Sequence, residues 1–302
     1  MLISDGFISD IVRFFNNKIL GSAITTRVYT EAVQTSYAAT VSAGHPVKPE
    51  SEPFFDGLGS EFVYFTDNET DSYEDELGNV SYPPRPFGDH GATNAWGGNY
   101  YFLRNKIRNT IDLTSATGYY ENAIVSIPSL HNVYIEDNVF YQDTADALVA
   151  WVYAPRDVPF GEVSIKRNKV IINVPEDAQV HTGGDRNLFF IFTSGNSQVQ
   201  DMSLLVEFSN NDIIYNCKEP TNKMIAAFYL YKDFDYSLSV HDNRAIFSGV
   251  RSGIRVNGFQ GSLKPTLLSV KNNFLKGNIA TSAIQSGRGM SRVIADVSGN
   301  II

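Results

Sequence analysis

Cysteine is almost absent from this chain of 302 residues. Cys217 is the only one, so an intrachain disulfide is excluded and the fold must rest on packing and backbone hydrogen bonds. Histidine is scarce as well, and the five residues, at positions 45, 90, 131, 181 and 241, lack the spacing of metal ligands. We therefore expect no disulfide framework, no metal site and no cofactor.

Long apolar runs and an excess of basic residues are also missing. No run approaches the ~18 residues of a membrane span, so we expect no transmembrane segment. The N-terminus, MLISDGFISD, has neither a basic region nor a small-residue cleavage site and does not resemble a signal peptide. A formal net charge of −9 disfavours binding to nucleic acid, because phosphate recognition needs a basic surface. The charge of a local groove can differ from this average, so the net charge does not exclude an anionic polysaccharide as a ligand.

Aromatic residues, by contrast, are abundant, with 16 Tyr and 20 Phe. Phenylalanine suits a long apolar core. Exposed tyrosine and tryptophan suit stacking against flat ligands such as sugar rings, although most aromatic side chains serve packing.

A repeated pattern organises the chain. In VSIKRNKVIIN (163–173) it reads apolar-x-apolar-x-x-Asn-x-apolar, and it recurs with its asparagine at positions 17, 105, 138, 168, 211, 243, 273 and 300. A weaker copy contains Asn68. From Asn105 onward the asparagines are 33, 30, 43, 32, 30 and 27 residues apart. A constant phase with variable spacing is typical of a solenoid with loop insertions.

The pattern predicts how one coil is built. Apolar residues two apart place their side chains on one face of a strand. The strand then turns at the asparagine and a second apolar strand begins, while asparagines of successive coils bond to one another as a ladder. A third strand is predicted between the copies, at 147–155, 187–195, 223–231 and 252–258. Residues 9–20 could form an amphipathic helix, but their fit to the repeat favours a strand.

This motif and coil length resemble the right-handed parallel β-helix of pectate-lyase-like proteins, a superfamily of polysaccharide lyases, glycoside hydrolases and bacteriophage tailspikes. The resemblance covers nearly the whole chain and implies an all-β, single-stranded right-handed parallel β-helix with three-strand coils. It specifies a fold and leaves the function open. The Asn-Thr-Asp, Asp-Asp and Gly-His-Gly motifs of polygalacturonase-type hydrolases do not occur, and the acidic calcium cluster of pectate lyases is not recognisable. The predicted ladder consists of Asn105, Asn138, Asn168, Asn211, Asn243, Asn273 and Asn300.

We expect one solenoid domain over residues 1–302, with a long loop insertion at about 45–99 that is rich in proline, glycine and acidic residues and has room for one irregular coil. Its acids could attract a cation, but they lack the spacing of an EF-hand loop. The repeat already runs at Val12 and still runs at Ile302. Because an open β-helix end exposes unpaired strand edges, we expect a longer polypeptide or a second chain to cover it. Resemblance to tailspikes implies a homotrimer attached to other virion tail proteins.

In the resembling family, ligands lie along a groove between one strand face and its variable loops. Here those loops flank the third strand, which makes the following positions candidates for ligand binding: Trp151, Tyr153, Arg156, Asp157, His181, Arg186, Tyr229, Tyr231, Arg251 and Arg255. Glycoside hydrolysis needs two carboxylates. Asp233 and Asp235, two residues apart on an extended strand, and Asp185, one coil earlier, are the candidates, although acids in such loops often only cap turns. Arg251 and Arg255 would suit a lyase acting on an anionic sugar, or a solvated strand edge.

Three functions follow as hypotheses. The first is a phage tailspike or tail-fibre β-helix on the virion, outside the bacterial cell, that binds and in one version depolymerises bacterial surface polysaccharide. If it is an enzyme, we expect a glycoside hydrolase rather than a lyase. The second hypothesis is a free-standing secreted polysaccharide lyase or hydrolase. The third is a non-enzymatic structural or adhesive virion β-helix, which the missing catalytic motifs favour.

Overall fold

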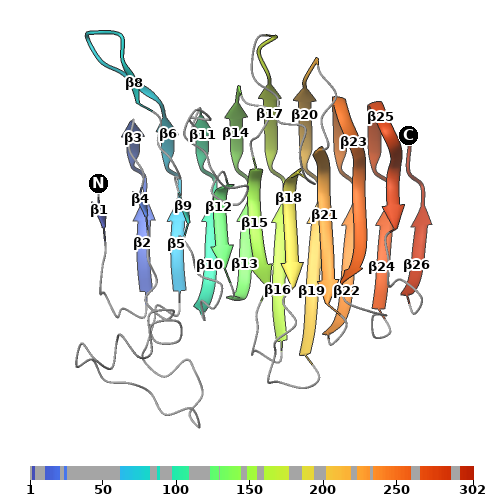
Figure 1. Ribbon diagram of the computed structural model, residues 1–302. Helices are drawn as coiled ribbons and strands as arrows, with labels where there is room; N and C mark the ends of the chain where they lie inside the picture. Colours follow the sequence, from blue (N-terminus) through green and yellow to red (C-terminus); the bar gives the residue numbers. More distant parts are fainter. Residues whose placement is uncertain are drawn as a thin grey trace.

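The chain folds into stacked coils of β-strands, seen from the side in the computed structural model of Figure 1. Neighbouring coils pair through parallel strands, and the antiparallel pair β7–β8 is the one exception among the described strands. The structure describes residues 2–3, 11–20, 24–25, 62–81, 87–88, 97–108, 123–128, 130–143, 148–154, 160–176, 186–193, 202–218, 223–231, 234–259, 266–286 and 293–302.

The first strand of each coil, which precedes the asparagine, belongs to a nine-stranded parallel sheet. Along these strands buried apolar residues alternate with residues on the outward face, as in Val133-Tyr134-Ile135, where the two apolar side chains are buried and the tyrosine is half-buried. The strands of this sheet, in spatial order, are β2 (Ile11–Phe15), β5 (Phe62–Thr66), β10 (Gly97–Leu103), β13 (Leu130–Glu136), β16 (Phe160–Lys166), β19 (Met202–Ser209), β22 (Phe234–His241), β24 (Thr266–Lys271) and β26 (Val293–Ser298).

The second and third strands form one continuous sheet of thirteen strands, because β23 belongs to both. Residues Arg244–Phe247 of β23 pair with β20, and residues Ser252–Phe259 pair with β21, so the strand passes from one wall of the solenoid to the other. The second strands are β3 (Lys18–Leu20), β6 (Glu69–Asp71), β11 (Lys106–Arg108), β14 (Val139–Gln142), β17 (Lys169–Asn173), β20 (Asp212–Asn216) and the start of β23 (Arg244–Phe259). The third strands are β9 (Phe87–Gly88), β12 (Ala123–Pro128), β15 (Leu148–Ala154), β18 (Arg186–Thr193), β21 (Lys223–Tyr231) and the end of β23, against which β25 (Phe274–Ser286) pairs.

Two small pairs lie beside these sheets. Strand β1 (Leu2–Ile3) pairs with β4 (Ile24–Thr25), and β7 (Tyr73–Glu74) pairs with β8 (Val80–Ser81) as a hairpin that projects from the top of the view in Figure 1. The range 45–99 also holds the first and second strands of one coil, since β5 and β6 pair with neighbouring coils on both sides. Residues 11–20, where a helix was the alternative, form strands β2 and β3.

The predicted asparagine ladder is confirmed. Each rung repeats one geometry: the backbone N–H and the side-chain amide of one asparagine both donate to the Oδ1 of the next. For Asn138 and Asn168 these distances are 3.1 and 2.9 Å. The Nδ2 group also donates to a strand carbonyl, as from Asn138 to the oxygen of Phe102 at 2.9 Å. The ladder runs through Asn17, Asn68, Asn105, Asn138, Asn168, Asn211, Asn243, Asn273 and Asn300.

The expectation that the asparagine itself turns the chain is wrong, because the residue before it has the left-handed backbone. In the coil of the opening pattern that residue is Arg167, with φ of 55°. Asn168 is left to supply the buried amide. The left-handed positions, in chain order, are Asn16, Asp67, Arg104, Asp137, Arg167, Asn210, Asp242, Asn272 and Gly299.

The arginines among these positions are held by acids of the preceding coil. The guanidinium of Arg104 binds both carboxylate oxygens of Asp67 at 2.7 Å, and that of Arg167 binds Asp137 at 2.7 and 2.9 Å. A left-handed backbone costs free energy in a residue other than glycine, and asparagine can offset that cost by a hydrogen bond to its own backbone. Arginine cannot do so, and here the bidentate pair with the acid stabilises the turn instead.

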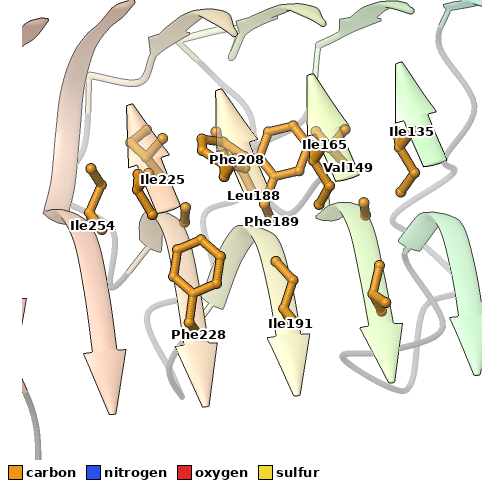
Figure 2. Close-up of a cluster of buried hydrophobic side chains, with 14 of the residues drawn as sticks. Ile135, Val149, Ile165, Leu188, Phe189, Ile191, Phe208, Ile225, Phe228 and Ile254 are labelled. Carbon is orange, nitrogen blue, oxygen red and sulfur yellow. The ribbon is translucent and has the colours of Figure 1, made fainter. Parts of the chain in front are cut away.

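The interior of the solenoid is a continuous apolar core. Side chains from the nine-stranded sheet meet those from the third strands, as in the cluster of Figure 2, where Phe208 faces Phe189 and Phe228. Phe65 and Phe102 stack in register on successive coils with ring centres 5.1 Å apart. The chain is therefore a parallel β-helix whose coils are fixed by this packing and by the buried amide ladder.

Candidate functional site

The outward side of the third strands is the face where sequence reasoning placed the ligand. Two rows of positions run along it across successive coils and alternate with buried residues such as Val152, Ile191 and Phe228. One row comprises Trp151, Phe190, Ala227, Arg255 and Gln285. The other comprises Tyr153, Phe192, Tyr229 and Asn257.

Arg255 and Tyr229 are in contact on this face. The guanidinium carbon of Arg255 lies 5.7 Å from the centre of the Tyr229 ring, and both side chains are half-buried. A guanidinium over an aromatic face is attracted by the ring, and Arg255 Nη1 also lies 3.9 Å from the Met224 sulfur. Next in the row, the Oε1 atom of Gln285 is buried, and no described residue donates a hydrogen bond to it. The arrangement therefore places a positive charge, an aromatic ring and a buried amide oxygen side by side.

The two predicted arginines do not occupy equivalent places. Both belong to β23, but the pairing register shifts between Phe247 and Val250 and again between Val250 and Ser252. Arg251 lies inside this irregular stretch, where the strand passes between walls, and Arg255 lies beyond it on the third-strand wall. Of the two, Arg255 is the one that belongs to the row of candidate positions.

Asp235 lies apart from the candidate tyrosines. It is exposed near the start of β22, in register with Ser203 of the nine-stranded sheet, whereas Tyr229 and Tyr231 belong to β21 of the thirteen-stranded sheet. The corner between the two walls thus separates the predicted acid from the predicted aromatic residues.

Several predicted residues are placed only by their backbone or not at all. Trp151, Tyr153, Arg186 and Tyr231 lie on β15, β15, β18 and β21, and Arg186 is in register with Lys223. Outside the described residues are Arg156, Asp157, His181, Asp185 and Asp233. The catalytic role of the three acids therefore stays a prediction.

A second candidate surface lies on the outward face of the nine-stranded sheet. Tyr64, Tyr101 and Tyr134 occupy the same register position on three successive coils, with ring centres 4.5 and 4.9 Å apart and rings within 11° of parallel. At one end the guanidinium carbon of Arg13 lies 5.4 Å from the centre of the Tyr64 ring. At the other end the row continues as Ser164 and Glu207.

Polar side chains run beside this stack. The Tyr134 hydroxyl donates to Glu162 Oε2 at 3.1 Å, and Asn132 Oδ1 accepts from the Glu162 backbone N–H at 3.0 Å. The Asn132 amide donates in turn to Asn99 Oδ1 at 2.6 Å. Partial burial, followed by the charge of Glu162, raises the pKa of Tyr134 to about 12. The phenol therefore stays protonated, and remains a donor, across the physiological range.

Further along the same face, carboxylates are bound in ion pairs. Glu207 receives Lys166 at 2.6 Å, the Ser209 hydroxyl at 2.9 Å and His241 Nε2 at 3.3 Å. Burial acts to raise the pKa of Glu207, but the hydrogen bonds from Lys166 and Ser209 outweigh it and the pKa is lowered. A general acid for glycoside hydrolysis needs the opposite shift. Among the described residues, every carboxyl whose pKa clearly departs from its usual value is shifted downward, which fits structural pairing: Asp67, Glu69, Asp75, Asp137, Glu207 and Asp296.

Sequence reasoning missed the stacked tyrosines, although the repeat contained the signal. In three copies the residue between the two apolar positions is tyrosine, as in Val63-Tyr64-Phe65, and a constant position within a solenoid repeat means a row in space. The aromatic candidates from the sequence belong instead to the third strands, at Trp151, Tyr153, Tyr229 and Tyr231.

In the part of the chain that the structure describes, no three His, Cys, Asp or Glu side chains gather closely enough to hold a metal ion. That part also contains no helix with the length and apolar character that crossing a bilayer requires. No protein-family model matches the chain, and searches of curated proteins and of solved structures find no match to it.

Proposed function

We propose that this chain is a β-helix of the phage tailspike or tail-fibre type, and that it binds bacterial surface polysaccharide along the outward side of its third strands. The observation that supports this proposal is the contact between Arg255 and Tyr229, set in two rows of positions that cross successive coils. A linear polymer is the ligand that suits such a surface, because each coil presents the same positions again one strand spacing further on.

The chemistry of the face favours an anionic sugar polymer. The positive charge of an arginine attracts a carboxylate, and a neighbouring aromatic ring provides apolar contact to a sugar ring. The net charge of −9 does not oppose this, since a cationic group on one face acts locally and distant surface charges are screened. The host-recognition role, a place on the virion outside the cell, a homotrimeric assembly and attachment to other tail proteins belong to the same proposal.

Binding is the part of the hypothesis that the geometry supports best. Cleavage by hydrolysis would need an acid and a second carboxylate on either side of the bound sugar. Asp235 lies on the other wall from Tyr229, and the described carboxylates with clearly shifted pKa values are held ionised. A free-standing lyase or hydrolase therefore gains no support from a specific observation.

The test is a binding measurement on the purified chain in its native assembly. Capsular and lipopolysaccharide O-chain polymers, anionic and neutral, are immobilised, and binding is compared between the wild type and Arg255→Gln. Loss of one charge-assisted contact, about 1.5–3 kcal/mol, should weaken binding of an anionic polymer by about 10- to 100-fold. Arg244→Gln is the matched control, because Arg244 belongs to the same strand but pairs with Asp212 at 2.6 Å on the opposite wall.

Two readouts separate adhesion from catalysis. New reducing ends would indicate hydrolysis, and ultraviolet absorbance from an unsaturated product would indicate a lyase. If no surface polysaccharide binds, or if Arg255→Gln and Arg244→Gln bind equally well, the proposed site is wrong. Sedimentation of the wild type tests the trimer.

A further inference from the structure

The outward face of the nine-stranded sheet holds a surface that the proposed function does not use. We call it the tyrosine face and define it by the stacked Tyr64, Tyr101 and Tyr134 with their polar neighbours Asn99, Asn132 and Glu162. It belongs to strands β5, β10, β13 and β16, whereas Arg255 and Tyr229 lie on the thirteen-stranded sheet. The two surfaces are thus on different walls of the solenoid.

Stacking alone does not account for tyrosine at these positions. The interior stacks phenylalanine in the same register, as Phe65 and Phe102 show. A hydroxyl adds nothing to such a contact between ring faces. On the tyrosine face, Tyr134 uses its hydroxyl to bind Glu162, but no described residue forms a hydrogen bond with the hydroxyls of Tyr64 or Tyr101. Both tyrosines are half-buried, and their two hydroxyl donors are not used by any described residue.

The aromatic character is confined to one part of the row. Beyond Tyr134 the same register position is taken by Ser164, Glu207, Ser239 and Ser269, so the coils do not require an aromatic residue there. Half-buried Phe62 and Leu103 flank the stack, and they give it an apolar margin beside the amides. The surface is therefore both apolar and rich in hydrogen-bonding groups, because it combines aromatic ring edges with two amides and one carboxylate on neighbouring coils.

Charge decides between classes of ligand. Glu162 borders the stack on one side, and its side chain accepts from the neutral hydroxyl of Tyr134. On the other side Glu136, in register with Leu103, is paired with Arg167 at 2.6 Å, and Arg13 lies over the Tyr64 ring at one end of the stack. The two arginines offset part of the acidic charge, while Glu162 repels an anionic group and accepts hydrogen bonds from hydroxyl groups. We infer that the tyrosine face is a second binding site, specific for a neutral, hydroxyl-rich polysaccharide, and separate from the arginine-bearing face. This inference stands whether or not the arginine-bearing face binds its own ligand.

The test removes only the two hydroxyls. The double variant Tyr64→Phe with Tyr101→Phe keeps the stack and breaks no hydrogen bond within the described residues, so it should fold with unchanged stability. Tyr141→Phe is the matched control: Tyr141 is a half-buried tyrosine on the second-strand wall, with the Arg108 guanidinium carbon 4.6 Å from its ring centre. Glu162→Gln serves as a second variant, because it removes the charge and keeps the size.

Binding is measured in the native assembly on an array of neutral and anionic bacterial oligosaccharides. The inference predicts that the wild type binds neutral glycans, that the double variant binds them at least about tenfold more weakly, and that Tyr141→Phe and Arg255→Gln bind them as the wild type does. Glu162→Gln should admit anionic glycans that the wild type rejects at this face.

Three results would overturn the inference. The first is that no neutral glycan on the array binds. The second is that neutral glycans bind the double variant as well as they bind the wild type. The third is that the double variant changes the sedimentation coefficient of the assembly instead of glycan binding, which would make the tyrosine face a contact between protein chains. Loss of anionic binding in Arg255→Gln alone concerns only the other wall.

Discussion

The Oδ1 atom of Asn211 accepts two hydrogen bonds from Asn168, one from its backbone N–H and one from its side-chain amide, both at 3.0 Å. The two residues are 43 positions apart in the chain, and both are almost completely buried. One side chain therefore satisfies two donors of a neighbouring coil in a place that water does not reach. Because the same contact recurs from coil to coil, the ladder fixes the stacking register along the solenoid.

The first prediction concerns the middle of this ladder. Asn168→Ala removes the acceptor of the Asn138 backbone N–H and Nδ2 group and the donor to the Ile135 carbonyl. Leaving buried polar groups unpaired costs about 1–3 kcal/mol each, so the free energy of unfolding should fall by about 3 kcal/mol or more. Urea unfolding measures the change. Asn300→Ala, at a partly exposed rung where water can replace the amide, should cost about 1 kcal/mol. Equal losses in the two variants would refute a buried ladder.

The second prediction concerns the pairing of β25 with β23. A Cβ atom on Gly277 would lie 1.7 Å from the carbonyl oxygen of Phe247, with φ of 154°. Gly277→Ala must displace the backbone, so we expect a loss of about 3 kcal/mol or more. In the β7–β8 hairpin, a Cβ on Gly78 meets nothing closer than 3.9 Å, and Gly78→Ala should cost only the left-handed backbone penalty of about 1–2 kcal/mol. Thermal unfolding of both variants measures these losses. If Gly277→Ala unfolds at the same temperature as the wild type, the close approach of these strands is contradicted.

The third prediction concerns acid. The hydrogen bonds from Arg167 lower the pKa of Asp137. A lowered folded-state pKa adds stability that is complete above the unfolded value and is lost as the pH falls through the folded one. Stability of the wild type should therefore decline between about pH 5 and pH 2 more steeply than that of Arg167→Gln. At neutral pH the variant should lose less than about 1 kcal/mol, because the pair is exposed. Parallel acid profiles would show that the pair carries no pH dependence.

The fourth prediction concerns alkali and the tyrosine face. The pKa of Tyr134 is raised from 10.0 to about 12, first by burial and then by Glu162. A pKa that is raised in the folded state contributes stability below the pKa of the unfolded state, and this contribution is lost as the pH rises through the pKa of the folded state. Glu162→Gln should lower the pKa of Tyr134 toward 10, which phenolate absorbance measures. Tyr134→Phe identifies the transition by removing it. If the pKa of Tyr134 is the same in Glu162→Gln as in the wild type, Glu162 does not contribute to raising it.

Much of the fold could be predicted from the sequence, because each rung of the ladder needs one asparagine at one phase of the repeat. The third strands were predicted at 187–195 and 223–231 and are found at Arg186–Thr193 and Lys223–Tyr231. The left-handed residue before each asparagine escaped prediction since its identity varies, and Arg104 and Arg167 are uncommon at such a backbone position. Their pairing with Asp67 and Asp137 depends on contacts across coils that no local pattern records.

The candidate site was less predictable, for a geometric reason. Asp235 and Tyr231 are four residues apart, but a corner of the coil lies between them, and spacing alone does not locate that corner. The three tyrosines of the tyrosine face occupy the same position of the repeat, which the sequence shows. That they stack on one another depends on the strand register, which places Tyr64, Tyr101 and Tyr134 side by side and which the sequence does not show.

The most direct measurement is hydroxyl-radical footprinting of the native assembly with and without an anionic bacterial surface polysaccharide, followed by mass spectrometry of each tyrosine. If the polymer lies along the third strands, oxidation of Tyr229 falls when it is added, while oxidation of Tyr64 and Tyr101 on the other wall stays the same. If Tyr229 is oxidised equally with and without a polysaccharide that demonstrably binds, the ligand does not lie on this face and the central proposal fails.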